Sequence, residues 1–160
     1  MLSISLICVG RMREQHYISA FAEYEKRLKP YCHFELTELA ESKLPQDPSQ
    51  AEIDAGLKKE AAQIESRIPS GAYVVALCIE GRQFGSSAFA DLLQKCANDG
   101  KSRICFIIGS SFGLDSCIKT RADLRLSMSE MTFPHHLARV MLAEQIYRGI
   151  MIIEGSKYHK

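Results

Sequence analysis

The sequence lacks any hydrophobic run long enough to cross a membrane. Apolar residues make up 46% of the 160 residues, yet no stretch approaches the ~18 consecutive apolar residues typical of a membrane-spanning helix. The segment from Met1 to Ile7 lacks the basic region and cleavage site of a signal peptide, so we interpret it as a first strand. We therefore expect a cytoplasmic protein, with residues 1–160 forming one domain that buries a sizeable core.

Excess charge and paired cysteines are also missing. The chain has 20 basic and 19 acidic residues, a formal net charge of +1, whereas proteins that grip naked nucleic acid through its phosphates usually show a clear basic excess. Any RNA partner must then be held by a local patch or by a surface shared between two subunits. None of the six cysteines forms a Cys-x-x-Cys pair. Cys8, Cys78 and Cys105 fall in apolar runs, which favours reduced core thiols over disulfides.

Several motifs that identify enzyme classes are absent. There is no Gly-x-Ser-x-Gly elbow, and no cysteine has an obvious base partner, so a hydrolase has little support. The glycine-rich fingerprints of dinucleotide-binding proteins and P-loop enzymes are missing as well. His135 and His136 are adjacent, point to different faces of a helix and have no third ligand at a fitting spacing, so no metal site is expected.

Apolar periodicity predicts an alternating series of strands and helices. We expect strands at 2–9, 31–39, 73–79, 103–108 and 123–128, and helices at 13–29, 50–67, 86–98, 114–121 and 135–153. Residues 80–82 are expected to form a loop. Such alternation predicts an α/β fold, with a single-domain, mostly parallel sheet flanked by helices on both faces.

Three helix starts have recognisable sequence signals. Ser49 and Glu52 have the spacing of a capping box. Ser86 or Ser87 is expected to cap the third helix, and Pro134 is expected at the first position of the last helix.

Two predicted strands end in loops of small, polar or turn-forming residues. One is followed by Gly109-Ser110-Ser111-Phe112-Gly113 and the other by residues 129–134. Glycines let backbone N–H groups approach a ligand, and a helix N-terminus favours polar or anionic groups. Because the carboxyl ends of parallel strands meet at one edge of a sheet, the sequence predicts a ligand crevice there. A plain tight turn is the alternative for residues 109–113.

The last predicted helix is apolar over a broader surface than one core-facing stripe requires. Its apolar residues are Leu137, Val140, Met141, Leu142, Ile146, Tyr147, Ile150 and Ile153. One face can pack on the sheet and the rest on a partner helix, whereas Arg139, Glu144 and Arg148 argue against complete burial. We therefore expect a homodimer built largely on this helix. The two arginines are expected to contact RNA phosphate or to order the active site; surface salt bridges with Glu144 are the alternative.

Short motifs distributed over the whole chain combine into one specific pattern. They are Val9-Gly10, residues 23–28, Ile108-Gly109 with Gly113, residues 131–135, Arg139-Val140, Glu144-Gln145, Tyr147-Arg148 and Tyr158-His159-Lys160. In this combination the chain resembles the RlmH family of the SPOUT superfamily. The members of that family methylate N3 of a pseudouridine in large-subunit (23S) ribosomal RNA.

The resemblance implies S-adenosylmethionine as the cofactor. The implied cofactor-binding residues are Leu77, Gly109, Met128, Ser129, Glu130, Met131, Thr132 and Phe133. A valine at Gly109 is expected to occupy the cofactor's space and to leave the fold intact. The implied catalytic residues are Arg139, Tyr158 and His159. The candidates for accepting the N3 proton are His159 first, then His135 or a water held by Tyr158, and the sequence does not choose among them.

The resemblance also implies a C-terminal trefoil knot, which no periodicity could predict. Its implied partners are a second copy of the chain and the ribosomal RNA within the ribosome, with the C-terminal tail acting at the partner's site. Two residues depart from the family: Ser110 stands where it usually has Gly, and Glu130 where it usually has Lys. They leave a non-catalytic ribosome-associated binding module as the alternative. An enzyme with a nucleotide cofactor is a third possibility, disfavoured because an acidic ribose partner is missing.

Overall fold

Five strands form one parallel sheet in the order β2-β1-β4-β3-β5. The computed structural model describes all residues from Met1 to Lys160. The strands are β1 (Leu2–Val9), β2 (Cys32–Leu39), β3 (Tyr73–Gln83), β4 (Arg103–Ile108) and β5 (Leu124–Ser127). The helices are α1 (Gln15–Leu28), α2 (Gln50–Glu65), α3 (Ser86–Asn98), α4 (Ser116–Arg121) and α5 (His135–Ile153). The predicted α/β class and the parallel sheet are confirmed.

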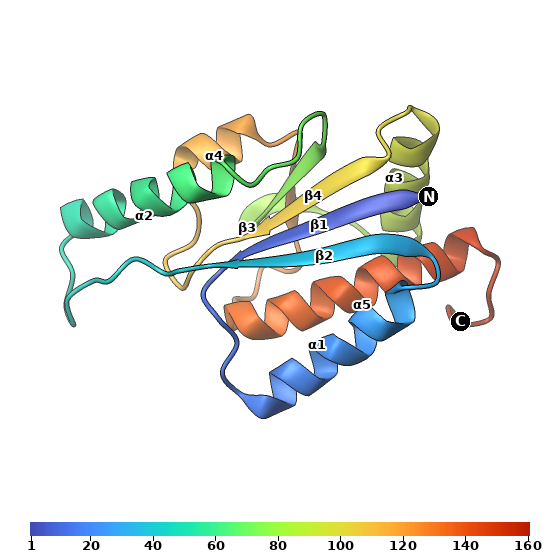
Figure 1. Cartoon of the computed structure of the whole chain (residues 1–160), viewed down its shortest axis with the longest axis horizontal. Coiled ribbons are helices and arrows are strands. Elements are labelled where there is room, and N and C mark those ends of the chain that lie inside the picture. The colour runs from blue at the N-terminus through green and yellow to red at the C-terminus, as the bar shows by residue number, and fades with distance from the viewer.

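Helices cover both faces of the sheet, so the central strands are buried on both sides. Helices α1, α3 and α5 pack on one face, and α2 and α4 pack on the other (Figure 1). Alternate residues of β4 serve the two layers: Ile104 and Phe106 contact the first, and Cys105 and Ile107 the second. A strand buried on both faces needs an uninterrupted apolar run, which explains the run from Leu6 to Val9 in β1 and from Ile104 to Ile108 in β4.

Helix starts agree with the sequence signals in one case and differ in two. The capping box at Ser49 and Glu52 is confirmed, since each side chain bonds the backbone N–H of the other residue. The prediction of a serine cap on α3 was wrong, because Gly85 occupies the N-cap and the Ser86 hydroxyl donates instead to Gln145 Oε1 at 2.8 Å. Pro134 is the N-cap of α5 and not its first residue.

Strand β3 continues through the segment that was predicted to be a loop. Leu77 and Arg82 both pair with Leu126 of β5, so the strand breaks register and then resumes pairing. At Gly81 a Cβ atom would lie 2.8 Å from the backbone of Arg125 and Leu126. The prediction failed because this second pairing depends on a close backbone approach that local polarity does not reveal.

Helix α5 crosses the molecule beside α1 and α3 (Figure 1). Its residue Gly149 allows a close approach to α3, where a Cβ atom would lie 2.9 Å from Leu93 Cδ1. Even with this helix of 19 residues, the chain contains no helix that is both long and apolar enough to span a membrane. The knot implied by the resemblance stays a prediction.

Candidate active site

A cavity of about 640 Å³ opens where β4 and β5 end, beside the register break of β3. Strand β3 lies between β4 and β5 in the sheet, so the segments that follow β4 and β5 meet residues 77–80 of β3 at one edge. The walls come from Leu77 to Glu80, from the loop at 108–114, and from the segment between Met128 and the first turn of α5. The size falls in the range of small-molecule and cofactor sites, roughly 300–1,000 Å³.

The structure brings seven of the eight residues predicted to bind a cofactor to this cavity. They are Leu77, Gly109, Met128, Ser129, Met131, Thr132 and Phe133. The eighth, Glu130, is exposed and does not line the cavity. The charge that this residue inverts relative to the family is therefore directed at solvent.

The loop after β5 is held by its own hydrogen bonds. The Ser127 hydroxyl donates to the carbonyl of Ser129 at 3.0 Å, and the backbone N–H of Met131 donates to Ser129 Oγ at 3.0 Å. The two serine hydroxyls thereby supply hydrogen-bond partners for backbone groups that have none in an irregular segment. This wall of the cavity is formed before any ligand enters.

The loop after β4 is a tight turn that depends on Gly109. The backbone N–H of Gly113 donates to the Ser110 carbonyl at 2.9 Å, and Gly113 has a φ of +85°. A Cβ atom at Gly109 would lie 2.2 Å from the Gly113 carbonyl oxygen. A valine at Gly109 was expected to leave the fold intact, but its first side-chain atom would collide with this turn, so the turn itself would have to shift.

A buried carboxyl group supports this turn from behind. Glu60 of α2 is only 4% exposed and borders a small void together with Ser110 and Phe112. Burial raises the pKa of the Glu60 carboxyl, and a hydrogen bond from the Ser110 side chain opposes that rise. Sequence reasoning missed Glu60, although it stands four residues from Gly56 and from Ile64, on the apolar stripe of its helix.

The first turn of α5 brings two histidines to the edge of the cavity. His135 lines it, and burial together with the neighbouring His136 lowers the pKa of its imidazole. The His136 ring is turned away, with Nδ1 3.2 Å from Glu14 Oε2. His135 is therefore the only imidazole in direct contact with the cavity, and a lowered pKa keeps it neutral and able to accept a proton.

Arg139 is fully buried, contrary to the expectation that it argues against burial of α5. Its Nη1 donates to Glu38 Oε2 at 2.7 Å and its Nη2 to the Gly10 carbonyl at 2.9 Å. Glu38 Oε2 also accepts the backbone N–H of Met12 at 3.0 Å. The alternative of a salt bridge to Glu144 is wrong for this residue, and a guanidinium with no exposed surface cannot reach an RNA phosphate.

The C-terminal tail folds back onto the middle of α5 and lies outside the cavity. The Tyr158 hydroxyl donates to Glu144 Oε1 at 3.2 Å, and its ring lies 5.0 Å from that of Tyr147. Arg148 forms an ion pair with Glu144 at 2.7 Å, which is the salt bridge given above as the alternative role of this arginine. Its guanidinium carbon lies 4.7 Å from the centroid of the Tyr158 ring. Burial and the adjacent Glu144 raise the pKa of Tyr158. His159 is exposed, and its Nδ1 lies 3.4 Å from Arg148 Nη1 in this cluster; Lys160 is exposed as well.

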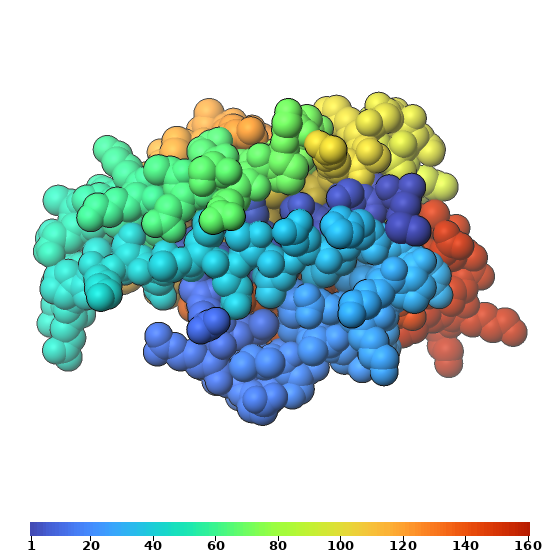
Figure 2. All heavy atoms as spheres, viewed as in Figure 1, coloured from blue at the N-terminus to red at the C-terminus, as the bar shows by residue number.

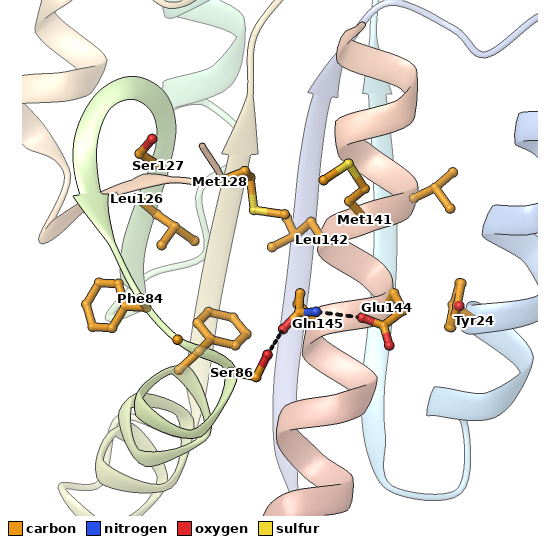
Figure 3. A pocket seen from close by; sticks show the side chains of 13 residues that line it. Tyr24, Phe84, Ser86, Leu126, Ser127, Met128, Met141, Leu142, Glu144 and Gln145 are labelled. Atoms are coloured by element: carbon orange, nitrogen blue, oxygen red, sulfur yellow. Dashed lines mark hydrogen bonds between the residues drawn. The ribbon is translucent and has the colours of Figure 1, made fainter. Parts of the chain in front are cut away.

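A second hollow, of about 460 Å³, lies between α3 and α5. A chain of hydrogen bonds runs along it from the Ser86 hydroxyl through Gln145 to Glu144 (Figure 3). Met128 and Met141 face each other across the hollow, and Met128 also lines the first cavity. The groove, as we call this hollow, thus adjoins the cavity and carries an apolar, half-buried face of α5.

No group of three or more His, Cys, Asp or Glu side chains is arranged to hold a metal ion. The chemically distinctive surfaces are the cavity, the groove and the tail. In the space-filling view the C-terminal residues protrude at the end of the molecule opposite α2 (Figure 2).

Comparison with known proteins shows similarity over nearly the whole chain. A family model described as "Predicted SPOUT methyltransferase" matches residues 2–159. A "Ribosomal RNA large subunit methyltransferase H" from Streptococcus suis (strain 05ZYH33) is 47% identical, and one from Streptococcus pyogenes serotype M5 (strain Manfredo) is 45% identical. Both alignments cover 99% of this chain and 100% of the relative.

Solved structures show the same fold at low sequence identity. The tRNA (m1G37) methyltransferase from Aquifex aeolicus superposes with a TM-score of 0.50 at 14% identity, covering 92% of this chain and 69% of that one. A probable methylase family protein from Haemophilus influenzae Rd KW20 gives 0.54 at 13% identity, covering 99% and 70%. The full-length matches at 45–47% identity carry the assignment: the chain belongs to the SPOUT methyltransferase family, and within it to the ribosomal RNA large subunit methyltransferases H.

Proposed function

We propose that the chain transfers a methyl group from S-adenosylmethionine to N3 of a pseudouridine in 23S ribosomal RNA, in the cytoplasm and on the ribosome. The observation that carries this proposal is the cavity at the ends of β4 and β5, beside the register break of β3, in a chain whose relatives are named for large-subunit ribosomal RNA methylation. The resemblance of the whole chain to the RlmH family supports the choice of base and atom.

The residues of the cavity fit S-adenosylmethionine. Leu77, Met128 and Phe133 offer apolar surface for a purine, and the turns around Gly109 and Ser129 offer backbone groups and hydroxyls for the polar parts. When bound, the cofactor supplies an activated methyl group that needs orientation more than chemical help. The protein's task is to hold the nucleophile in line with that methyl group and to exclude water.

The N3–H of pseudouridine is a weak acid whose proton must leave during attack. We assign His159 as the acceptor, supplied by the tail of a second copy. His135 is the alternative, because it lines the cavity and its pKa is lowered. Tyr158 keeps its own proton, since its pKa is raised, but can position a water. Arg139 acts indirectly, by fixing the β1–α1 loop to α5 through Gly10 and Glu38.

Cofactor binding is expected to depend on the turn at Gly109. Gly109→Ala places a Cβ atom against the Gly113 carbonyl, so the turn must move and at least a hundredfold of cofactor affinity should be lost. Isothermal titration calorimetry with S-adenosylmethionine measures this. Gly85→Ala is the control, because its Cβ atom meets nothing within 4 Å and its φ is −72°.

The same titration separates the proposed enzyme from the non-catalytic binding module. Unchanged cofactor affinity in Gly109→Ala would place the cofactor site elsewhere. A parent chain that binds no S-adenosylmethionine would favour the binding module.

We further propose that the chain acts as a homodimer in which the groove is covered by a second copy. The half-buried apolar side chains of Met128, Val140 and Met141 are the observation that supports this. A standard interface removes about 1,600 Å² from water, and each Å² of apolar surface contributes roughly 25 cal/mol before the cost of association.

Sedimentation at micromolar concentration is expected to give twice the chain mass of 18.0 kDa. Met141→Glu would place an unpaired charge in the covered groove and should yield a folded monomer. Lys58→Glu, an exposed change on the opposite face of the sheet, is the control. A monomeric parent, or a dimer unaffected by Met141→Glu, would contradict the proposed interface.

The function as a whole is tested by mass spectrometry of large-subunit ribosomal RNA from cells that lack the protein. We expect one N3-methylated pseudouridine to be replaced by unmodified pseudouridine. The methyl group should return on complementation with the parent gene and not with a cofactor-binding variant. An unchanged modification pattern would exclude the proposed substrate.

A further inference from the structure

Three large apolar side chains surround the mouth of the cavity. The chain exposes only six large hydrophobic side chains: Met1, Ile18, Tyr31, Ile79, Phe112 and Met131. Three of them, Ile79, Phe112 and Met131, line the one cavity, with exposed fractions of 50%, 45% and 74%. Single exposed apolar residues are ordinary, but a cluster on separate segments around one cavity indicates a binding surface. We call these three residues the rim.

The aromatic member of the rim lies on a turn held by hydrogen bonds. Phe112 sits on the tight turn closed by the bond from Gly113 N–H to the Ser110 carbonyl. Ser110 is buried, and Glu60 supports its side chain from α2. The half-exposed Phe112 side chain is thus carried on a turn that is already formed, which reduces the entropic cost of binding a ligand.

Basic side chains contribute little to ligand binding at the rim. Lys119 is the only lysine or arginine that lines the cavity, and its ammonium group pairs with Glu80 at 2.6 Å. The chain as a whole carries a net charge of only +1. A ligand at the rim is therefore recognised by apolar and stacking contacts more than by attraction between its phosphates and a basic patch.

We propose that the rim is a platform on which an unpaired base of the RNA substrate stacks, with Phe112 as the stacking residue. This inference rests on the proposed function, because the nucleophilic base must approach the methyl donor through the mouth of the cavity. Proteins recognise unpaired RNA bases by stacking them on aromatic side chains, which tolerates near-neutral protein charge. The rim places such a side chain beside the reacting position.

The test uses the full-length protein and ribosomes from cells that lack it, with methyl transfer followed as a function of ribosome concentration. Phe112→Ala should raise KM for ribosomes about tenfold, the loss expected for one stacked base, with kcat nearly unchanged. Phe112→Trp should keep the parent's KM, because it preserves the aromatic face. Ile18→Ala, which removes an exposed apolar side chain outside the cavity, is the matched control.

Two further measurements separate the other possible occupants of the rim. Calorimetry with S-adenosylmethionine should give the same Kd for Phe112→Ala as for the parent; a weakened Kd would make the rim a cofactor contact and overturn the inference. Sedimentation should give the parent's mass; dissociation would make the rim an interface between copies, with the same consequence.

If Phe112→Ala has the same KM for ribosomes as the parent protein, Phe112 does not stack on the RNA. The proposed function would still stand. If the parent itself fails to methylate ribosomes, the proposed function and the inference both fall.

Discussion

Deletion of Tyr158, His159 and Lys160 is expected to abolish methyl transfer while the dimer and the cofactor affinity persist. The tail follows α5, whose first turn borders the cavity and whose 19 residues separate the two ends by about 27 Å at ~1.5 Å per residue. In its own subunit the tail is held against the middle of α5 by Glu144 and Arg148 and does not line the cavity. It can reach the cavity of a second copy if the two α5 helices pack antiparallel.

Single substitutions separate chemistry from anchoring. His159→Ala should reduce kcat nearly as much as the deletion does, because it removes the assigned proton acceptor. Tyr158→Phe removes only the bond to Glu144 and should cost about 1 kcal/mol of stability. Full activity in the deletion variant would show that the tail has no catalytic part and would favour His135 as the acceptor.

Mixed dimers test whether the tail acts across the interface. One subunit lacks residues 158–160, and the other carries Thr132→Trp, which fills the cavity from an exposed position on its lining. If each tail acts at the partner's cavity, one site of the mixed dimer lacks both a tail and an open cavity, and the other site has both. About half the parent activity should therefore survive. Inactive mixed dimers would mean that each tail serves its own subunit.

Arg139→Ala is expected to lower the free energy of unfolding by about 3 kcal/mol. The change removes two buried donors and leaves Glu38 and the Gly10 carbonyl short of partners. For a chain of this size the melting temperature should fall by roughly 6–12 °C. Thermal denaturation followed by circular dichroism measures it. Methyl transfer should fall in parallel, because the β1–α1 loop loses its attachment to α5.

Arg148→Ala is the matched control on the same helix. It breaks an ion pair with Glu144 whose side chains are 25% and 17% exposed, so it should cost less than about 1 kcal/mol. A double-mutant cycle with Glu38→Gln then isolates the buried pair. An Arg139→Ala protein that melts like the parent and yet transfers no methyl group would contradict the positioning role and indicate direct catalysis.

Local pattern was enough to predict most elements and the place of the cavity. The apolar runs of β1 and β4 are long because both faces are covered, and α5 runs from His135 to Ile153 as its periodicity predicted. Glycines and short polar residues after β4 and β5 marked the edge at which the cavity opens. In these segments the local structure is decided by residues that are close in sequence.

Features that depend on distant pairings could not be predicted in this way. The extension of β3 requires the backbone of β5 to lie against Gly81. The burial of Arg139 requires Glu38, which is a hundred positions away and resembles any other acid at a strand end. The burial of Glu60 could have been predicted, because an acidic residue on the apolar stripe of a helix indicates a buried hydrogen-bond partner. Its neighbour Ser110 lies on another segment.

The strand order also determines when, during synthesis, the sheet can close. Strand β1 is an inner strand that lies beside β4, so one of its edges stays unpaired until residues 103–108 have left the ribosome. Helix α5, which covers α1 and α3, emerges last. A nascent chain therefore carries an open, apolar strand edge through most of its translation, the condition under which unfinished chains pair with one another. The fold is completed only when α5, the last element, has been synthesised. A chain released from a ribosome that stalled before α5 would therefore have an uncovered core.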